Sequence, residues 1–232
     1  MIINGKISYS ELEQLVFCLK DKIVNSYLKK IYHYNGRWLL KFNHYSFVFE
    51  PGNCIWPGSF SEREKQLHSV CIKIRKEIGD SKVLEINLVN NDRTVVINFK
   101  NYKLVFELYA KGNLLLLDNL NKIIVLTRIY PDCSHGIIYN LKDYKIYDSD
   151  FSVCSYGYKN KNTEIFSYSN ENENEFNNVE IALNHLWNIK YQNQESTTEK
   201  KKKKIKATPQ ENINLQITNY YKKMDKKKSE ID

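Results

Sequence analysis

The sequence predicts an α+β domain: an antiparallel, β-rich lobe with two amphipathic helices. Two segments repeat apolar residues with helical spacing, and short β-prone runs alternate with turn residues over 27–49 and 83–127. No apolar run approaches the ~18 residues that a membrane-spanning helix needs. With 232 residues, of which 42% are hydrophobic and 27% charged, the chain is long enough to bury a sizeable core.

The first predicted helix begins after Ser8 and ends at Asn25. Ser8 and Glu11 have the Ser-x-x-Glu spacing of a capping box, in which each side chain pairs with a backbone amide of the first turn. Apolar residues follow at positions i, i+3, i+4, i+7 and i+11, so they form one stripe toward a core. They are Leu12, Leu15, Val16, Leu19 and Ile23.

Three strands are predicted next. Asn35-Gly36 lies between the β-prone runs 27–34 and 37–42. Asn-Gly is a strong hairpin signal, because both residues tolerate positive φ. Residues 45–49 are a third strand candidate, whereas the two prolines and two glycines of 51–58 predict an irregular loop.

A second helix is predicted from the same two features, a capping-box spacing and an apolar stripe. Ser61 and Glu64 repeat the capping-box spacing, and Gly79 is placed to end the helix. The apolar stripe consists of Leu67, Val70, Cys71, Ile74 and Ile78.

A meander of five strands follows and completes the antiparallel sheet. The strand-like runs are 83–89, 94–99, 103–109, 114–117 and 122–127. The chain is therefore divided into a domain over 1–150, a polar linker over 151–178, and a last part over 179–232. That last part is expected to hold one short helix and a lysine-rich, mobile tail.

The net charge of +8 is concentrated in this tail. Residues 200–232 hold 11 Lys and four acidic residues, whereas residues 1–199 hold 24 basic and 23 acidic residues. The tail could bind RNA non-specifically, or it could be a solvated lysine run, and both interpretations stay open.

Sequence motifs for catalysis or cofactors are not found. The five cysteines form no Cys-x-x-Cys pair, which fits a reducing compartment and predicts no zinc site. There is no phosphate-cradling glycine loop and no Gly-x-Ser-x-Gly elbow. We therefore expect no catalytic residues, no metal and no cofactor.

Three stretches, in this order and spacing, resemble the NFACT-N domain that begins the NFACT proteins. They are Cys71-Ile-Lys-Ile-Arg-Lys-Glu-Ile-Gly79, Asn91-Asp-Arg-Thr-Val-Val-Ile-Asn-Phe99 and Val105-Phe-Glu-Leu-Tyr-Ala-Lys-Gly-Asn-Leu-Leu-Leu-Leu-Asp118. Residues 7–11 and 127–131 fit the same pattern, so the resemblance covers residues 1 to about 150. The family includes ribosome quality control complex subunits, nuclear export mediator factor and bacterial proteins resembling fibronectin-binding proteins.

The resemblance implies a cytoplasmic, non-catalytic factor with no membrane contact. NFACT proteins bind the large ribosomal subunit with peptidyl-tRNA after stalling, and they position tRNA for rescue and template-free tailing of the nascent chain. Partners implied are the large subunit, tRNA and, through the family's coiled coil, a ribosome-bound ubiquitin ligase. The implied fold resembles the N-terminal lobe of formamidopyrimidine-DNA glycosylase. Glycosylase activity is not implied, because those enzymes attack with a proline where this chain has Ile2.

The resemblance also implies site residues. The family's Asp-Arg pair for tRNA handling falls on Asp92 and Arg93, and a family aspartate falls on Glu11. An Arg fork suits phosphate or a base edge, although Asn-Asn-Asp-Arg is also good turn chemistry. The basic helix of the family falls on Lys73, Arg75 and Lys76, which could meet RNA phosphates or form a solvated face. We expect the pair at 92–93 to lie beside these helix cations.

Residues Glu107, Gly112 and Asn113 match a family signature and are predicted to shape a turn between strands.

Two departures from the family leave an alternative open. The stretch after residue 140 is short and polar for the family's helix–two-turn–helix unit, which suggests a reduced form or a fragment of a longer reading frame. The alternative function is a degenerate NFACT-like module that binds RNA or protein without tailing activity.

Overall fold

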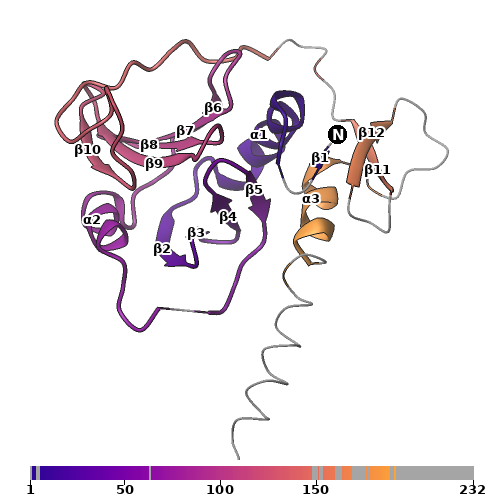
Figure 1. Ribbon diagram of the computed structural model, residues 1–232, viewed down its shortest axis with the longest axis horizontal. Coiled ribbons are helices and arrows are strands. Elements are labelled where there is room, and N and C mark those ends of the chain that lie inside the picture. The colour runs from indigo at the N-terminus through magenta and orange to yellow at the C-terminus, as the bar shows by residue number, and fades with distance from the viewer. Residues whose placement is uncertain are drawn as a thin grey trace, which may run out of the picture. The chain divides into compact units, whose positions relative to one another are not determined.

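A computed structural model confirms the α+β class and the antiparallel sheets (Figure 1). It describes residues 2–3, 6–62, 64–147, 151, 154–159, 164–168, 176, 178–188 and 191. Residues 1–189 form one compact unit. The predicted lysine-rich tail lies outside the described residues, and the likeness to a glycosylase lobe stays a prediction.

Three helices and three sheets are formed by the part of the chain described. The helices are α1 (Tyr9–Ile23), α2 (Ser69–Ile78) and α3 (Val179–Trp187). One sheet has the order β2-β3-β4-β5, with β2 Leu28–Tyr34, β3 Arg37–Phe42, β4 Ser46–Glu50 and β5 Cys54–Pro57. A second has the order β10-β9-β8-β7-β6, with β6 Glu85–Leu88, β7 Thr94–Asn98, β8 Tyr102–Glu107, β9 Asn113–Asp118 and β10 Ile123–Leu126. The third, β1-β12-β11, joins β1 Ile2–Ile3, β12 Glu164–Tyr168 and β11 Ser155–Lys159.

The two larger sheets share an aromatic core. Phe47 and Phe49 of β4 meet Phe106 of β8 edge to face, with ring centroids 5.8 and 5.1 Å apart. All three rings are fully buried. Edge-to-face pairs add a preferred geometry to the burial of apolar area, so these rings fix how the sheets pack.

The first helix and the first hairpin are confirmed. The Ser8 N–H donates to Glu11 Oε2 at 2.9 Å, and the Glu11 N–H donates to Ser8 Oγ at 3.4 Å, which completes the capping box. Asn25 follows the helix with a φ of 65°. Asn35 and Gly36 both have positive φ between β2 and β3, as a tight hairpin turn requires.

The predicted start of the second helix is wrong. Helix α2 begins at Ser69, and its N-cap is His68, whose Nδ1 accepts from the Val70 N–H at 3.3 Å. Glu64 does not cap a helix, because its carboxylate accepts from His33 Nδ1 at 2.8 Å across the fold. Gly79 follows the helix as predicted, although the positive φ belongs to Asp80.

The loop predicted over 51–58 contains strand β5. Trp56 is fully buried in this strand, and its Nε1–H donates to Glu50 Oε2 at 2.9 Å. The turn residues lie at the ends of the strand, with Gly52 in the hairpin and Pro57 as the last residue at a sheet edge. Proline is tolerated there because no ladder donor is needed.

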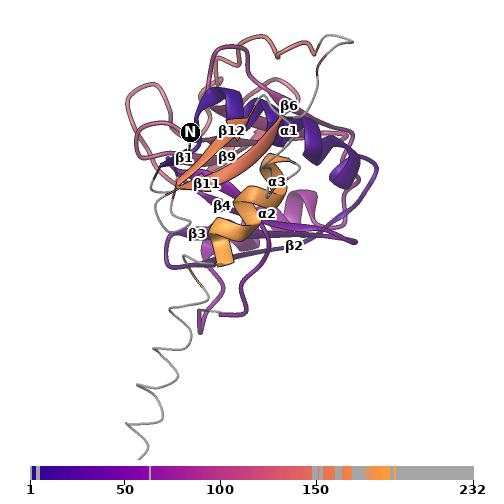
Figure 2. The same cartoon turned by 90° about the vertical axis from the view of Figure 1, so that its right-hand side faces the viewer.

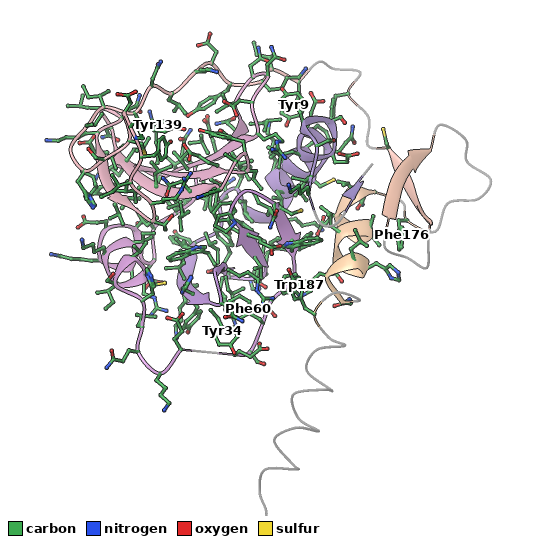
Figure 3. The ribbon with its side chains drawn as sticks, in the orientation of Figure 1. Tyr9, Tyr34, Phe60, Tyr139, Phe176 and Trp187 are labelled. Atoms are coloured by element: carbon green, nitrogen blue, oxygen red, sulfur yellow. The ribbon has the colours of Figure 1, made fainter. Side chains whose placement is uncertain are left out.

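The stretch predicted as a polar linker contains regular structure. Strands β11 and β12 form a hairpin, and β12 pairs with β1 from the start of the chain. The short helix predicted from Val179 onward is α3, capped by Asn178. It packs on β5, where Asn184 Nδ2 donates to the Pro57 carbonyl at 3.1 Å and the Trp187 ring centroid lies 6.0 Å from that of Trp56. Figure 2 shows α3 in orange, and Figure 3 labels Trp187 on it.

A segment after β10 covers the five-stranded sheet. Tyr130, Tyr139, Leu141 and Tyr144 pack against a buried cluster that includes Val96 and Leu115. Figure 3 labels Tyr139. The second half of this segment, residues 128–144, is held by backbone hydrogen bonds, among them Tyr139 N–H to Asn121 O and Asn90 N–H to Asp143 O. The side chains of this segment cover the buried cluster of the five-stranded sheet.

We predict that Gly112→Ala destabilises the protein far more than Gly36→Ala. Both glycines have positive φ, so an alanine costs about 1–2 kcal/mol in either place. At Gly36 the added Cβ meets nothing within 4 Å, whereas at Gly112 it overlaps the Gly52 nitrogen and the Pro51 carbonyl carbon. The free energy of unfolding from urea titration should fall by at least ~3 kcal/mol for Gly112→Ala. Equal losses in the two variants would contradict this packing.

Candidate nucleic-acid interface

Asp92 and Arg93 lie in the turn between β6 and β7, as the sequence predicts. Asn91 has a φ of 54°, and the Asp92 N–H donates to the Val89 carbonyl at 3.2 Å. Arg93 is half-buried, and its Nη1 donates to the Ile7 carbonyl at 3.0 Å. The guanidinium is thereby anchored at the residue that precedes the N-cap of α1.

Asp92 has other partners. Its Oδ1 accepts from Thr94 Oγ1 at 3.2 Å, and its Oδ2 lies 3.8 Å from Lys142 Nζ. The Lys142 side chain is 66% exposed, so this ion pair contributes little to stability. Among the described residues, Arg93 donates to Ile7 and makes no hydrogen bond to Asp92.

Glu11 lies in the same corner as Arg93. Its carboxylate accepts from the Ser8 N–H, and Ser8 follows the Ile7 carbonyl that Arg93 binds. Glu11 is only 3% exposed, however, so its capping role is what the geometry supports. The predicted contact with tRNA stays a prediction.

The cations of α2 are not beside this corner, and the predicted grouping is wrong. Helix α2 contacts β2 and β10, whereas the turn at 92–93 leaves β6 at the opposite edge of the five-stranded sheet (Figure 1). Four strand spacings separate these edges by roughly 19 Å. Lys73 and Lys76 are exposed, which leaves both earlier interpretations open.

Arg75 has a structural role in α2. Its Nε donates to the Ile31 carbonyl at 3.0 Å, Nη2 donates to the same oxygen, and the guanidinium lies over the Tyr32 ring at 4.6 Å. The guanidinium therefore ties α2 to β2, which competes with any contact to RNA.

A groove of about 440 Å³ lies where turns of the two large sheets meet, and sequence reasoning missed it. Lys111, Gly112 and Arg128 line one side, from the turn after β8 and the end of β10. Residues His33, Trp38 and His68 are also in its lining. Asn53, another lining residue, accepts from the Ile7 N–H at 3.0 Å. The groove therefore adjoins the Arg93 corner through Ile7.

The family signature at Glu107, Gly112 and Asn113 shapes this side of the groove. Asn113 is fully buried, and its Oδ1 accepts from the backbone N–H groups of Leu114, Thr127 and Arg128. The predicted turn is confirmed, with Gly112 at a φ of 64°. The signal was present in the sequence, but its contact with residues 127–128 depends on tertiary pairing.

Glu107 stabilises the same region by binding three tyrosine hydroxyls. The carboxylate is fully buried, and Oε1 accepts from the hydroxyls of Tyr109, Tyr130 and Tyr139 at 2.9, 2.7 and 2.9 Å. Burial and the nearby carboxylate raise the pKa of Tyr109 to about 12 and place the pKa values of Tyr130 and Tyr139 higher still. All three hydroxyls therefore stay protonated and donate.

Over the part of the chain that the structure describes, no three His, Cys, Asp or Glu side chains are grouped to hold a metal ion. Within the same residues, no helix has the length and hydropathy needed to cross a bilayer.

We predict that His33 makes stability depend on pH. Burial lowers the pKa of His33 below its ordinary 6.5, against the opposing effect of Glu64. The unfolded chain then binds a proton more readily, so the contribution is full above 6.5 and is lost as pH falls through the folded-state pKa. The Tm should drop more between about pH 7.5 and 5 for the native sequence than for His33→Gln. Parallel Tm curves would contradict it.

Three known proteins with similar sequences are all named as ribosome quality control complex subunit 2, Rqc2, or as its homolog. Ribosome quality control complex subunit 2 of Schizosaccharomyces pombe is 32% identical over 142 residues, which cover 55% of this chain and 14% of that protein. The archaeal Rqc2 homolog aRqcH of Methanocaldococcus jannaschii is 33% identical over 81 residues, covering 33% of this chain and 12% of that protein. Ribosome quality control complex subunit 2 of Saccharomyces cerevisiae is 27% identical over 220 residues, which cover 88% of this chain and 21% of that protein. The chain thus spans about a fifth or less of these relatives.

No family model matches the chain. Among solved structures, the N-terminal domain of fibronectin-binding protein PavA from Streptococcus pneumoniae has a TM-score of 0.49 at 18% identity, covering 60% of this chain and 64% of that one. The N-terminal part of the fibronectin/fibrinogen-binding protein FBPS from Streptococcus suis has the same TM-score at 15% identity, covering 60% and 61%.

Proposed function

We propose that this chain, a sequence relative of the NFACT-family ribosome quality control factors, binds the large ribosomal subunit that carries peptidyl-tRNA and positions the tRNA for rescue and template-free tailing. The resemblance to the NFACT family is confirmed by relatives named as Rqc2 or its archaeal homolog. Binding, tailing and a cytoplasmic location are proposals for this chain.

The observation that supports tRNA binding is the anchored Arg93 at the corner of β6, β7 and α1. One of its nitrogens is committed to Ile7, and the side chain remains half exposed. An arginine held in this way loses less conformational entropy when it binds a phosphate or a base edge. Its position corresponds to the Asp-Arg pair that the resemblance implies for tRNA handling.

The proposed mode of action is binding and positioning, not catalysis. Oε1 of the buried Glu107 carboxylate accepts from three tyrosine hydroxyls, and the Glu11 carboxylate accepts from the backbone N–H of its cap, Ser8. Neither is placed as an acid or base in an open site. The chain would act by holding tRNA in place on the subunit.

The alternative is a degenerate NFACT-like module that binds RNA or protein without tailing. It is favoured by the 11 lysines of residues 200–232, which would bind a polyanion without sequence preference. Under this alternative, deletion of 200–232 should weaken RNA binding more than a change at Arg93.

We predict that Arg93→Glu weakens tRNA binding by about tenfold or more, because it replaces an anchored donor with a repelling charge. Lys100→Glu is the control, since it makes the same charge reversal on an exposed turn at the other end of β7. Fluorescence anisotropy with labelled tRNA measures both, and circular dichroism checks the fold. Equal effects of the two substitutions would argue for non-specific binding.

We also predict enrichment on large subunits that carry peptidyl-tRNA. In co-sedimentation, the full chain should pellet with such subunits in clear excess over empty ones, because tRNA provides part of the binding surface. Arg93→Glu should remove that excess. Equal pelleting with both kinds of subunit would count against the proposed function.

A further inference from the structure

Arg128 is held on its main chain by a buried side chain. Asn113 is 0% exposed, its Oδ1 accepts from the Arg128 N–H at 3.0 Å, and its Nδ2 donates to the Arg128 carbonyl at 2.8 Å. A buried amide is costly unless its hydrogen bonds are made, so this pairing fixes the backbone of Arg128 firmly.

The side chain of Arg128 is held as well. Its Nε donates to the Gly112 carbonyl at 3.3 Å, and its guanidinium lies 5.2 Å from the centre of the Tyr130 ring. The Tyr130 hydroxyl donates in turn to Glu107. In the described residues, the two terminal nitrogens of Arg128 have no hydrogen-bond partner. Their N–H groups form a preorganised fork at the groove, which suits a phosphate.

Other groups in the groove also donate. Lys111 is exposed on the turn after β8. His68 Nδ1 accepts from the Val70 N–H, so a neutral His68 carries its proton on Nε2 and offers a donor. Glu50 is the acidic residue in the lining, and its Oε2 is engaged by Trp56. The donors and the two cations outweigh this one carboxylate, which favours an anionic ligand.

We infer that Arg128 contacts RNA phosphate and that this groove takes the sugar–phosphate backbone of the tRNA next to the segment at Arg93. For the identity of the RNA, the inference rests on the proposed function. The Ile7 N–H donates to the Asn53 carbonyl and the Ile7 carbonyl accepts from Arg93, so the groove and the Arg93 corner lie close together. Two anchored arginines near each other fit a polyanion better than a single small anion. Asn113 and Tyr130 are positioning residues, because they act through Arg128.

The test is tRNA binding measured by anisotropy over a range of salt concentrations. Arg128→Gln and Lys111→Gln are compared with the native sequence and with Lys100→Gln, which removes an exposed charge from the turn between β7 and β8. We expect Arg128→Gln to weaken binding about tenfold and to lower the slope of log affinity against log salt by about one. Lys111→Gln should lower the slope similarly, whereas Lys100→Gln should change neither quantity.

Conservative variants separate position from charge. Arg128→Lys keeps the charge and should restore the salt slope, but it should leave binding weaker than native because a lysine cannot keep the fork and the Gly112 bond together. Tyr130→Phe keeps the ring and removes the bond to Glu107. It should weaken binding without changing the slope, and an unchanged circular dichroism spectrum and Tm would show that this is not a smaller folded fraction.

The outcomes are distinguishable. If Arg93→Glu weakens tRNA binding but Arg128→Gln and Lys111→Gln do not, the inference about the groove is overturned and the proposed function stands. If the native sequence does not bind tRNA, the inference about the groove and the proposed function are both contradicted. If Arg128→Gln fails to fold, Lys111→Gln decides, since an exposed turn lysine can be replaced without loss of structure. Equal affinity for polyglutamate and tRNA at one salt concentration would overturn the assignment to RNA in favour of an acidic protein.

Discussion

The hydrogen bonds of two buried polar side chains are the constraint on which one end of the fold depends. Asn113 and Glu107 are both inaccessible to solvent, and they flank the same tight turn. Unpaired, each would cost several kcal/mol, so the segments that supply their partners must return to this turn. The Asn113 side chain accepts from the backbone N–H groups of residues 127 and 128. Glu107 accepts from three tyrosine hydroxyls, two of which belong to the segment that covers the sheet. A groove with oriented cations results from this arrangement of the core.

Local signals predicted much of the fold. The capping box at Ser8 and Glu11 and the hairpin turn at Asn35-Gly36 depend on residues that are close in sequence, and the structure contains both. Long-range partners decided the rest. Glu64 pairs with His33, 31 residues away, so the helix begins later than its spacing indicated. Polar strands β11 and β12 lack a clear alternation of their own, and β12 pairs with β1 from the other end of the described chain.

The candidate site was predictable in parts and not as a whole. The turn at Asp92-Arg93 and the signature at 107–113 were found from sequence order. That Ile7 would join Arg93 to Asn53, and that α2 would lie across the sheet, depends on which strands occupy the edges. Periodicity says which face of a strand is buried, but it does not give the order of strands in a sheet. The groove, assembled from several turns, has no linear signature.

The pairing of β1 with β12 sets an order for folding during synthesis. Ile2 pairs with Ile165, so this small sheet cannot close until nearly the whole unit has left the ribosome. The two larger sheets join neighbours in sequence and can form from short contacts while synthesis continues. Residues 2–3 therefore reach their final pairing after both larger sheets can form, although they are made before every residue of those sheets.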